Sequence, residues 1–305
     1  MLRTRVGSLE LTSPLLTGSG TFGHDPAALR FLGPGDLGAL VLKTVTPEPR
    51  HGNPAPRMAE FHGGVLNAIG LENKGLAYWR ETVAPELAAL PVPVVANAGG
   101  HSVDDYVAMT GAFDAMEGVA AIELNLSCPN VADGIQFSTE VPALLEVVRA
   151  CRAVTPKPLW VKLSPNVASI VPFARASEEA GADALTVCNT LIGMLVDWRA
   201  RAPMIANGTG GMSGPAVKPL ALRLVHESAR AVSIPVLASG GASTAEDVLE
   251  FTVAGATAVQ VGTASFRRPD AISSIARELR ELLEQEGTTL DELRASLRWP
   301  HPVSC

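Results

Sequence analysis

One short pattern recurs along this chain and constrains its fold more than any other feature. Residues 180–186 are Ala-Gly-Ala-Asp-Ala-Leu-Thr, and residues 254–260 are Ala-Gly-Ala-Thr-Ala-Val-Gln. Each resembles a helix end, a glycine stop and an apolar strand, and the same theme recurs from Leu37 and from Glu117. Four junctions of this kind indicate a repeated βα unit and therefore a parallel sheet.

Eight apolar segments are predicted to be strands, at residues 15–17, 39–42, 93–96, 119–122, 159–161, 184–187, 235–238 and 258–261. Helical patterns separate them, for example at 141–153, 168–180, 215–231 and 244–254. Eight βα units predict a TIM (β/α)8 barrel, an α/β fold that residues 1–305 form as a single domain. We also expect a β-hairpin over residues 2–13. Long loops at 45–74 and 191–214 are predicted on the C-terminal face of the barrel.

Composition narrows the classes of function. The chain has 305 residues, of which 47% are hydrophobic, and a formal net charge of -7. An acidic balance argues against surfaces for nucleic acid or for an anionic membrane, since both need basic patches. Neither a signal peptide nor a bilayer-spanning stretch is visible, so we expect a soluble, cytoplasmic protein. No Cys-x-x-Cys pair occurs among Cys128, Cys151, Cys188 and Cys305, which argues against a zinc or iron–sulfur site in this chain.

Residues 123–130, Glu-Leu-Asn-Leu-Ser-Cys-Pro-Asn, mark the predicted chemical centre. The apolar residues 119–122 lead into this segment as a buried strand, and Cys128 lies where the strand ends. Pro129 cannot continue the strand because it has no N–H group. The C-terminal ends of barrel strands build the active site, so a catalytic thiol is one interpretation of Cys128. The alternative is a buried structural cysteine.

Other predicted strands also end in polar residues, namely Ser19, Lys43, Asn97, Asn125, Lys162, Asn189 and Thr190. The two charged members are lysines, which favours an anionic, hydrogen-bonding ligand over two structural salt bridges. The last two strands are followed by Gly240, Gly241, Gly262 and Thr263. Glycines at this place let backbone N–H groups approach a phosphate, although tight turns without a ligand are the alternative.

Residues 18–23, Gly-Ser-Gly-Thr-Phe-Gly, match the dinucleotide-binding pattern GxGxxG after a strand. A dinucleotide site also needs an acidic residue about 20 positions further on. The second strand ends instead in Lys43 and Thr44. We therefore favour glycines that let a different ligand lie close against the backbone.

These segments together resemble the class 1 dihydroorotate dehydrogenases, flavin enzymes of pyrimidine synthesis. The resemblance extends from Gly18 to Phe266. Its matching segments are residues 43–44, 48–54 (Glu-Pro-Arg-His-Gly-Asn-Pro), 67–71 (Asn-Ala-Ile-Gly-Leu), 123–130, 161–166 (Val-Lys-Leu-Ser-Pro-Asn), 189–190, 206–211 (Ala-Asn-Gly-Thr-Gly-Gly) and 261–263. Segment 67–71 looks like subclass 1B, since subclass 1A tends to carry Ser-Met-Gly-Leu there. Class 2 uses a serine base and an N-terminal membrane-associated extension, whereas this chain has Cys128.

The resemblance implies oxidation of dihydroorotate to orotate with FMN as cofactor. It implies that Cys128 removes the C5 proton while the C6 hydrogen passes to flavin N5 as hydride, and that Lys43 and Lys162 assist, Lys162 by stabilising charge on the flavin. The residues it assigns to FMN are Ser19, Lys43, Thr44, Asn97, Asn125, Lys162, Cys188, Gly214, Gly240, Gly241, Gly262 and Thr263. Those it assigns to dihydroorotate are Lys43, Asn67, Ala68, Ile69, Gly70, Leu71, Asn125, Asn189 and Thr190. Residues 129–139 are expected to close over the site, although 134–139 (Gly-Ile-Gln-Phe-Ser-Thr) lack a second glycine that the family pattern has near the phenylalanine.

Subclass 1B also implies partners. Its catalytic subunits form homodimers and pass electrons to a second subunit that carries FAD and an iron–sulfur cluster and reduces NAD. Direct use of fumarate, as in subclass 1A, is the alternative. Among other flavin barrels, a tRNA-dihydrouridine synthase would need a basic RNA surface, which the net charge of -7 disfavours. A phosphate-binding barrel isomerase would be colourless, and a scaffolding protein would leave the strand-end lysines and thiol unexplained.

Overall fold

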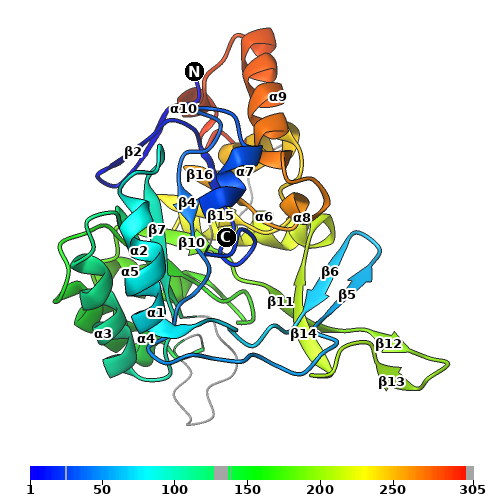
Figure 1. The fold of residues 1–305 in the computed structure, drawn as a ribbon. Coiled ribbons are helices and arrows are strands. Elements are labelled where there is room, and N and C mark those ends of the chain that lie inside the picture. Colours follow the sequence, from blue (N-terminus) through cyan, green and yellow to red (C-terminus); the bar gives the residue numbers. More distant parts are fainter. Residues whose placement is uncertain (25, 127–136, 138, 300–305) are drawn as a thin grey trace.

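The structure, a computed structural model, describes all residues except 25, 127–136, 138 and 300–305. In this described part, eight parallel strands form the barrel that the repeated junctions predict (Figure 1). In sheet order they are β3 (Leu15–Thr17), β16 (Ala258–Val261), β15 (Val236–Ser239), β10 (Ala184–Val187), β9 (Leu159–Lys162), β8 (Ala121–Asn125), β7 (Val94–Ala98) and β4 (Leu40–Val41). A parallel bridge between Leu16 and Ala39 joins the two ends of the sheet. The prediction of a TIM barrel is confirmed.

Helices cover the outside of the barrel. The longer ones are α3 (Val103–Asp114), α4 (Val141–Arg152), α5 (Val171–Glu179), α6 (Lys218–Ala229), α7 (Ala245–Ala254) and α9 (Ala271–Glu286). The short ones are η1 (Pro26–Phe31), α1 (Gly75–Tyr78), η2 (Trp79–Val83), α2 (Ala84–Leu87), η3 (Pro215–Val217), α8 (Ala264–Arg267) and α10 (Leu290–Leu293). In α4, Leu144, Val147, Val148 and Cys151 are buried. Their spacing places them on one face, which packs on the barrel.

The glycines at the helix-to-strand junctions have positive φ, the conformation expected of a glycine that ends a helix. Gly181 follows α5 with φ of 96°, and Gly255 follows α7 with φ of 119°. Glycine adopts such positive φ values without the steric penalty of a side chain, so it ends the helix sharply. At the other end of α7, Thr244 and Asp247 form a capping box. These local signals place β10 and β16 directly after their helices.

The predicted N-terminal hairpin is present and closes one end of the barrel. It consists of β1 (Thr4–Val6) and β2 (Leu9–Leu11), paired antiparallel. Val6 and Leu11 belong to the same buried cluster as Trp160 and the strand-opening residues Ala121, Ala184 and Ala258. This end is therefore filled with apolar side chains, and the opposite end is left to hold a site.

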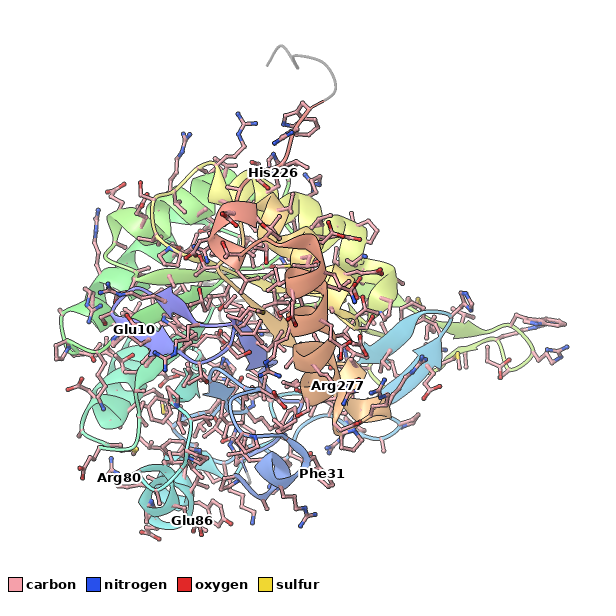
Figure 2. The ribbon with its side chains drawn as sticks, turned by 90° about the horizontal axis from the view of Figure 1, so that it is seen from above. Glu10, Phe31, Arg80, Glu86, His226 and Arg277 are labelled. Carbon is pink, nitrogen blue, oxygen red and sulfur yellow. The ribbon has the colours of Figure 1, made fainter. Side chains whose placement is uncertain are left out.

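The two long loops contain strands that their sequence did not predict. The first loop contributes β5 (Met58–Phe61) and β6 (Gly64–Asn67), and the second contributes β11 (Leu191–Met194) and β14 (Thr209–Ser213). They form one four-stranded antiparallel sheet in the order β11-β14-β6-β5. Beyond it, β12 (Val196–Asp197) and β13 (Ala202–Pro203) pair in an arm that leaves the body of the protein (Figures 1 and 2). Within the described residues, no helix is both long enough and apolar enough to span a membrane.

Candidate active site

A cavity of about 440 Å³ lies where the barrel strands end. The sheet of the two long loops forms one of its walls through Val65, Met212 and Ser213. Most of the predicted site residues line this cavity: Ser19, Lys43, Thr44, Asn67, Ile69, Leu71, Asn125, Lys162, Cys188, Asn189, Thr190, Gly214, Gly240, Gly241, Gly262 and Thr263. The barrel thus brings together residues that are up to 244 positions apart in the sequence, because every strand ends on the same face.

Three predicted site residues that the structure describes do not line the cavity, and a fourth falls outside the described residues. Ala68 and Gly70 do not line the cavity, although their neighbours Asn67, Ile69 and Leu71 do. Asn97 is completely buried and does not line the cavity. Cys128, with residues 129–136 and 138 of the loop expected to close over the site, lies outside the described residues.

One end of the cavity is built from glycine backbone. Gly240 has φ of 136° and Gly241 has φ of 93°. A Cβ atom at Gly241 would lie 2.8 Å from the backbone nitrogen of Lys218, so glycine is needed for space as well as for conformation. In the part of the chain that the structure describes, the amides of Gly240, Gly241, Gly262 and Thr263 donate to no protein acceptor. Unpaired amides that converge beside glycines fit a phosphate group.

Lys162 places a cation deep in the cavity. Its side chain comes from the end of β9, is 5% exposed, and donates from Nζ to Ser19 Oγ over 3.0 Å. Cys188 lies after β10 and is also buried. Burial raises the pKa of the Cys188 thiol to about 12, although the charge of Lys162 acts in the opposite direction. Cys188 is therefore a neutral thiol at physiological pH, which suits packing against a ligand and not proton abstraction.

Lys43 is the second lysine that lines the cavity. Burial lowers its pKa, the carboxylate of Glu72 raises it, and the guanidinium of Arg57 lowers it, so that the net direction is downward. His24, which the sequence did not single out, lies close enough to be affected by this lysine. Burial and the Lys43 charge together lower the pKa of His24 to about 4. His24 is therefore neutral at physiological pH and adds no competing positive charge.

A chain of side-chain hydrogen bonds runs from the cavity into the barrel. Asn189 Nδ2 donates to Asn125 Oδ1 over 3.2 Å, and Asn125 Nδ2 donates to Thr44 Oγ1 over 3.1 Å. Thr44 Oγ1 donates to Asn97 Oδ1 over 2.5 Å, and Asn97 Nδ2 donates to Glu123 Oε1 over 2.6 Å. The amides that line the cavity are therefore tied to a carboxylate beneath its floor.

Comparison with known proteins identifies the family. The family model described as dihydroorotate dehydrogenase matches residues 1–283. The chain belongs to the dihydroorotate dehydrogenase family. It is 49% identical over 287 residues to the dihydroorotate dehydrogenase B (NAD(+)) catalytic subunit of Trichlorobacter lovleyi, with 94% of each chain covered. The subunit of the same name from Geobacillus kaustophilus is 48% identical, over 94% of this chain and 92% of that one. The one from Listeria innocua is 44% identical, over 97% of this chain and 98% of that one.

The expectation of a dihydroorotate dehydrogenase fold and family is thus confirmed, but sequence reasoning missed several residues of the cavity. Met58, Val65 and Met212 lie on the sheet of the long loops, whose strands carry no clear periodicity. Gln260 and the buried Glu123 had a visible signal, because each is a polar residue inside an otherwise apolar strand. A buried polar group needs hydrogen-bond partners, so such positions are informative.

Proposed function

We propose that this chain is the catalytic subunit of an NAD-linked dihydroorotate dehydrogenase, which oxidises (S)-dihydroorotate to orotate in pyrimidine synthesis. The observation that carries the proposal is the cavity itself. It combines two lysines, three asparagines and a group of glycine amides that have no protein acceptor among the described residues. The names of the Trichlorobacter, Geobacillus and Listeria relatives support the same activity.

FMN is the cofactor that fits this cavity. The unpaired amides beside Gly240, Gly241 and Gly262 would hold its phosphate, and Gly214 and Thr263 line the same end. Bound FMN would supply the hydride acceptor for the reaction. Lys162 would hold a positive charge in a nearly water-free place, where a charge acts more strongly than in water.

Dihydroorotate is an anion with several carbonyl and N–H groups, and the remaining lining matches both features. Lys43 would attract the carboxylate. Asn67, Asn125 and Asn189 offer amide donors and acceptors to the ring, with Ile69, Leu71 and Thr190 completing the lining. Ala68 and Gly70 belong to the same segment, in which Gly70 has φ of 76°, a conformation that glycine adopts without a steric penalty.

Cys128 is the proposed general base, on the strength of its place in the sequence three residues after Asn125 of β8. Its thiolate would take the proton from C5 as the hydride leaves C6, which forms the C5–C6 double bond of orotate. A free thiol has a pKa of about 8.5, so the thiolate needs activation at neutral pH. The neutral Cys188 cannot replace it, since burial raises the pKa of that thiol to about 12.

The experiment that tests this function is an anaerobic titration. The purified protein is reconstituted with FMN, its visible spectrum is recorded, and dihydroorotate is added without oxygen. Loss of the flavin absorbance is the expected result. A yellow protein that keeps its colour would support a flavin-binding barrel but exclude dihydroorotate as its substrate. A protein that binds no FMN would exclude the proposed function altogether.

The electron acceptor follows from the same proposal. Electrons would pass to NAD through a partner subunit that carries FAD and an iron–sulfur cluster, and the protein would act in the cytoplasm. The reduced protein should therefore react slowly with fumarate alone. Rapid reoxidation by fumarate would point instead to a chain that works without that partner.

We also propose that the chain forms a homodimer through the arm of β12 and β13. Val196 and Trp198 are 54% and 71% exposed on this arm, which leaves the body in both views (Figures 1 and 2). Exposed apolar side chains on a projecting element indicate an interaction surface. Trp198→Ser should turn the dimer into a monomer in light scattering, whereas Trp299→Ser, at a second exposed tryptophan, should not. A dimer that survives Trp198→Ser would exclude the arm.

A further inference from the structure

Two of the amides that have no protein acceptor among the described residues belong to the loop between β15 and α7. This loop contains Gly240 and Gly241, whose φ values are 136° and 93°. Glycine restricts the backbone least of all residues, so these two positions do not hold the loop in this shape by themselves. Contacts from outside the two glycines therefore have to fix the direction in which their amides point.

Asp247 holds the end of the loop nearest α7. Its Oδ2 accepts from the backbone nitrogen of Ser243 over 2.7 Å, from Ser243 Oγ over 2.9 Å and from the backbone nitrogen of Thr244 over 3.0 Å. The Asp247 side chain is only 10% exposed. One carboxylate oxygen thus binds the loop, and the other, Oδ1, binds a different element.

Lys218, the first residue of α6, is that different element and contacts the loop at both ends. Its Nζ donates to Asp247 Oδ1 over 2.6 Å. Its backbone lies against Gly241, because a Cβ atom at Gly241 would lie 2.8 Å from the Lys218 nitrogen. The contacts therefore form a closed circuit from the glycine through Lys218 and Asp247 back to the loop. Such a circuit fixes the loop relative to α6 as well as to α7.

The ion pair is an addition to an ordinary helix cap. Asp247 completes the capping box that begins α7, and capping boxes also begin α3 and α10. The acidic residues of those two boxes, Asp105 and Glu292, form no ion pair with a residue that the structure describes. Capping a helix thus does not need a cation from another helix, which indicates a role for Lys218 in the loop.

Both partners are charged at physiological pH. Burial raises the pKa of Asp247, but hydrogen bonds from Lys218 and Ser243 outweigh it, so the net direction is downward. The hydrogen bonds that Lys218 donates to Asp247 and Glu250 raise the pKa of the lysine. Because the Lys218 and Asp247 side chains are only 24% and 10% exposed, water screens this pair less than a pair on the open surface.

We propose that Lys218 and Asp247 are positioning residues, which hold the two glycine amides in place for the phosphate of FMN and so make the site select FMN over riboflavin. This inference rests on the proposed function. Neither residue lines the cavity, so each acts through the loop and not by touching the cofactor. Riboflavin has the ring system and ribityl chain of FMN but no phosphate, so its binding does not need these amides. A loop already held in its binding conformation loses less freedom when the phosphate arrives, which strengthens FMN binding.

Four single variants separate this role from general damage. Lys218→Met removes the ammonium group but keeps an unbranched side chain, and Asp247→Asn leaves an amide that cannot accept hydrogen bonds on both sides. Lys218→Arg is the conservative variant, because a guanidinium can still bind both carboxylates. Glu250→Gln is the matched control, since it breaks the second ion pair of Lys218, at 2.9 Å, and leaves the bond to Asp247 in place.

The FMN-free protein is titrated with FMN and, separately, with riboflavin, and flavin fluorescence gives the two dissociation constants. Wild-type protein should bind FMN more tightly than riboflavin. We expect Lys218→Met and Asp247→Asn to raise the FMN constant by about tenfold, roughly the smallest effect of losing one hydrogen bond to a charged group. The riboflavin constant should change by less than about twofold, while Lys218→Arg and Glu250→Gln should stay within about threefold for both flavins.

The ratio of the two constants isolates the positioning role, because a protein that is merely less stable would bind both flavins less tightly. The double variant Lys218→Met with Asp247→Asn tests whether the two residues act through one bond. If they do, its FMN constant should match that of the weaker-binding single variant, since the second change removes nothing further.

Several outcomes would overturn the assignment. An FMN constant unchanged in both Lys218→Met and Asp247→Asn would show that the loop needs no such support. Equal weakening of FMN and riboflavin would reduce the effect to general damage. Equal weakening in Glu250→Gln would transfer it to the charge around α6, and a double variant whose losses add would separate the two residues. If one single variant does not fold, the other decides by the same ratio.

Failure of the proposed function is recognised separately, in the wild-type protein. A wild type that binds no FMN, or is not reduced by dihydroorotate, rejects that function. A wild type that binds FMN and riboflavin equally rejects the phosphate site and this role with it. A wild type that prefers FMN and is reduced by dihydroorotate, combined with normal FMN affinity in Lys218→Met and Asp247→Asn, overturns the positioning role alone.

Discussion

Gly241→Ala gives the sharpest test of the phosphate end of the cavity. The new Cβ would lie 2.8 Å from the Lys218 backbone nitrogen, whereas ordinary contact begins at 3.4 Å, so one peptide must move by about 0.6 Å. The neighbour is backbone and cannot rotate away. The φ of 93° adds a steric cost of about 1–2 kcal/mol for a residue with a side chain.

The displacement would act directly on FMN. A hydrogen bond from an amide to phosphate is near 2.9 Å, and a further 0.6 Å or so stretches it beyond useful length. Loss of one hydrogen bond to a charged group costs about 1.5–3 kcal/mol, which predicts an FMN dissociation constant raised roughly 10- to 150-fold. Titration of the FMN-free protein, followed by flavin fluorescence, measures this constant.

Gly255→Ala is the matched control for that experiment. It also has positive φ, at 119°, and its Cβ would lie 2.5 Å from Ala229 Cβ, but the residue ends α7 outside the cavity lining. It should lower the melting temperature and leave FMN affinity unchanged. If Gly241→Ala binds FMN as tightly as wild type, or if Gly255→Ala weakens FMN equally, the glycine amides do not form the phosphate site.

Three further predictions concern the base, the buried cation and one ion pair. Cys128→Ala should slow flavin reduction by roughly 10²- to 10⁴-fold in stopped flow with FMN still bound, while Cys151→Ala, at a buried thiol of α4, should not; equal rates in both would exclude the base. Lys162→Met should slow the same step by about 100-fold, and an unchanged rate would remove its electrostatic role. Burial raises the pKa of Asp247, but hydrogen bonds from Lys218 and others outweigh it, so the net pKa lies below the ordinary 3.8. The ionised form therefore adds stability above about pH 3.8 that is lost as the pH falls through the lower folded pKa. Asp247→Asn should lower the melting temperature at pH 7, and the difference should shrink below pH 3.8; a constant difference would contradict this account.

The barrel could be predicted from the sequence because its signals are local. A helix end, a glycine and an apolar strand are neighbours in the chain, and Gly181 and Gly255 have the positive φ that this junction requires. The predicted helix at 141–153 corresponds to Val141–Arg152, and the one at 244–254 to Ala245–Ala254. Strand-end residues could also be named, because the fold sends all of them to one face.

The sheet of the long loops could not be predicted in the same way. Its strand β14, Thr-Gly-Gly-Met-Ser, has neither alternation nor β-branched residues beyond the first. It becomes a strand because Gly211 pairs with Asn67, 144 positions away, and Ile192 pairs with Gly211 on the other side. Pairing across the barrel mouth, and not local propensity, decides this wall of the site.

The sequence by itself determined the repeat, the eight strands and the polar residues at their ends, since each depends on spacing that neighbouring residues carry. Only the tertiary structure decided which of those residues line the cavity and which lie beneath it. Asn97 and Asn125 both end strands, but one is buried against Glu123 and the other lines the site. Glu123 and Gln260 are 137 positions apart, and their hydrogen bond exists only because the barrel closes. Contacts of that kind depend on the completed fold, which is why no local pattern encodes them.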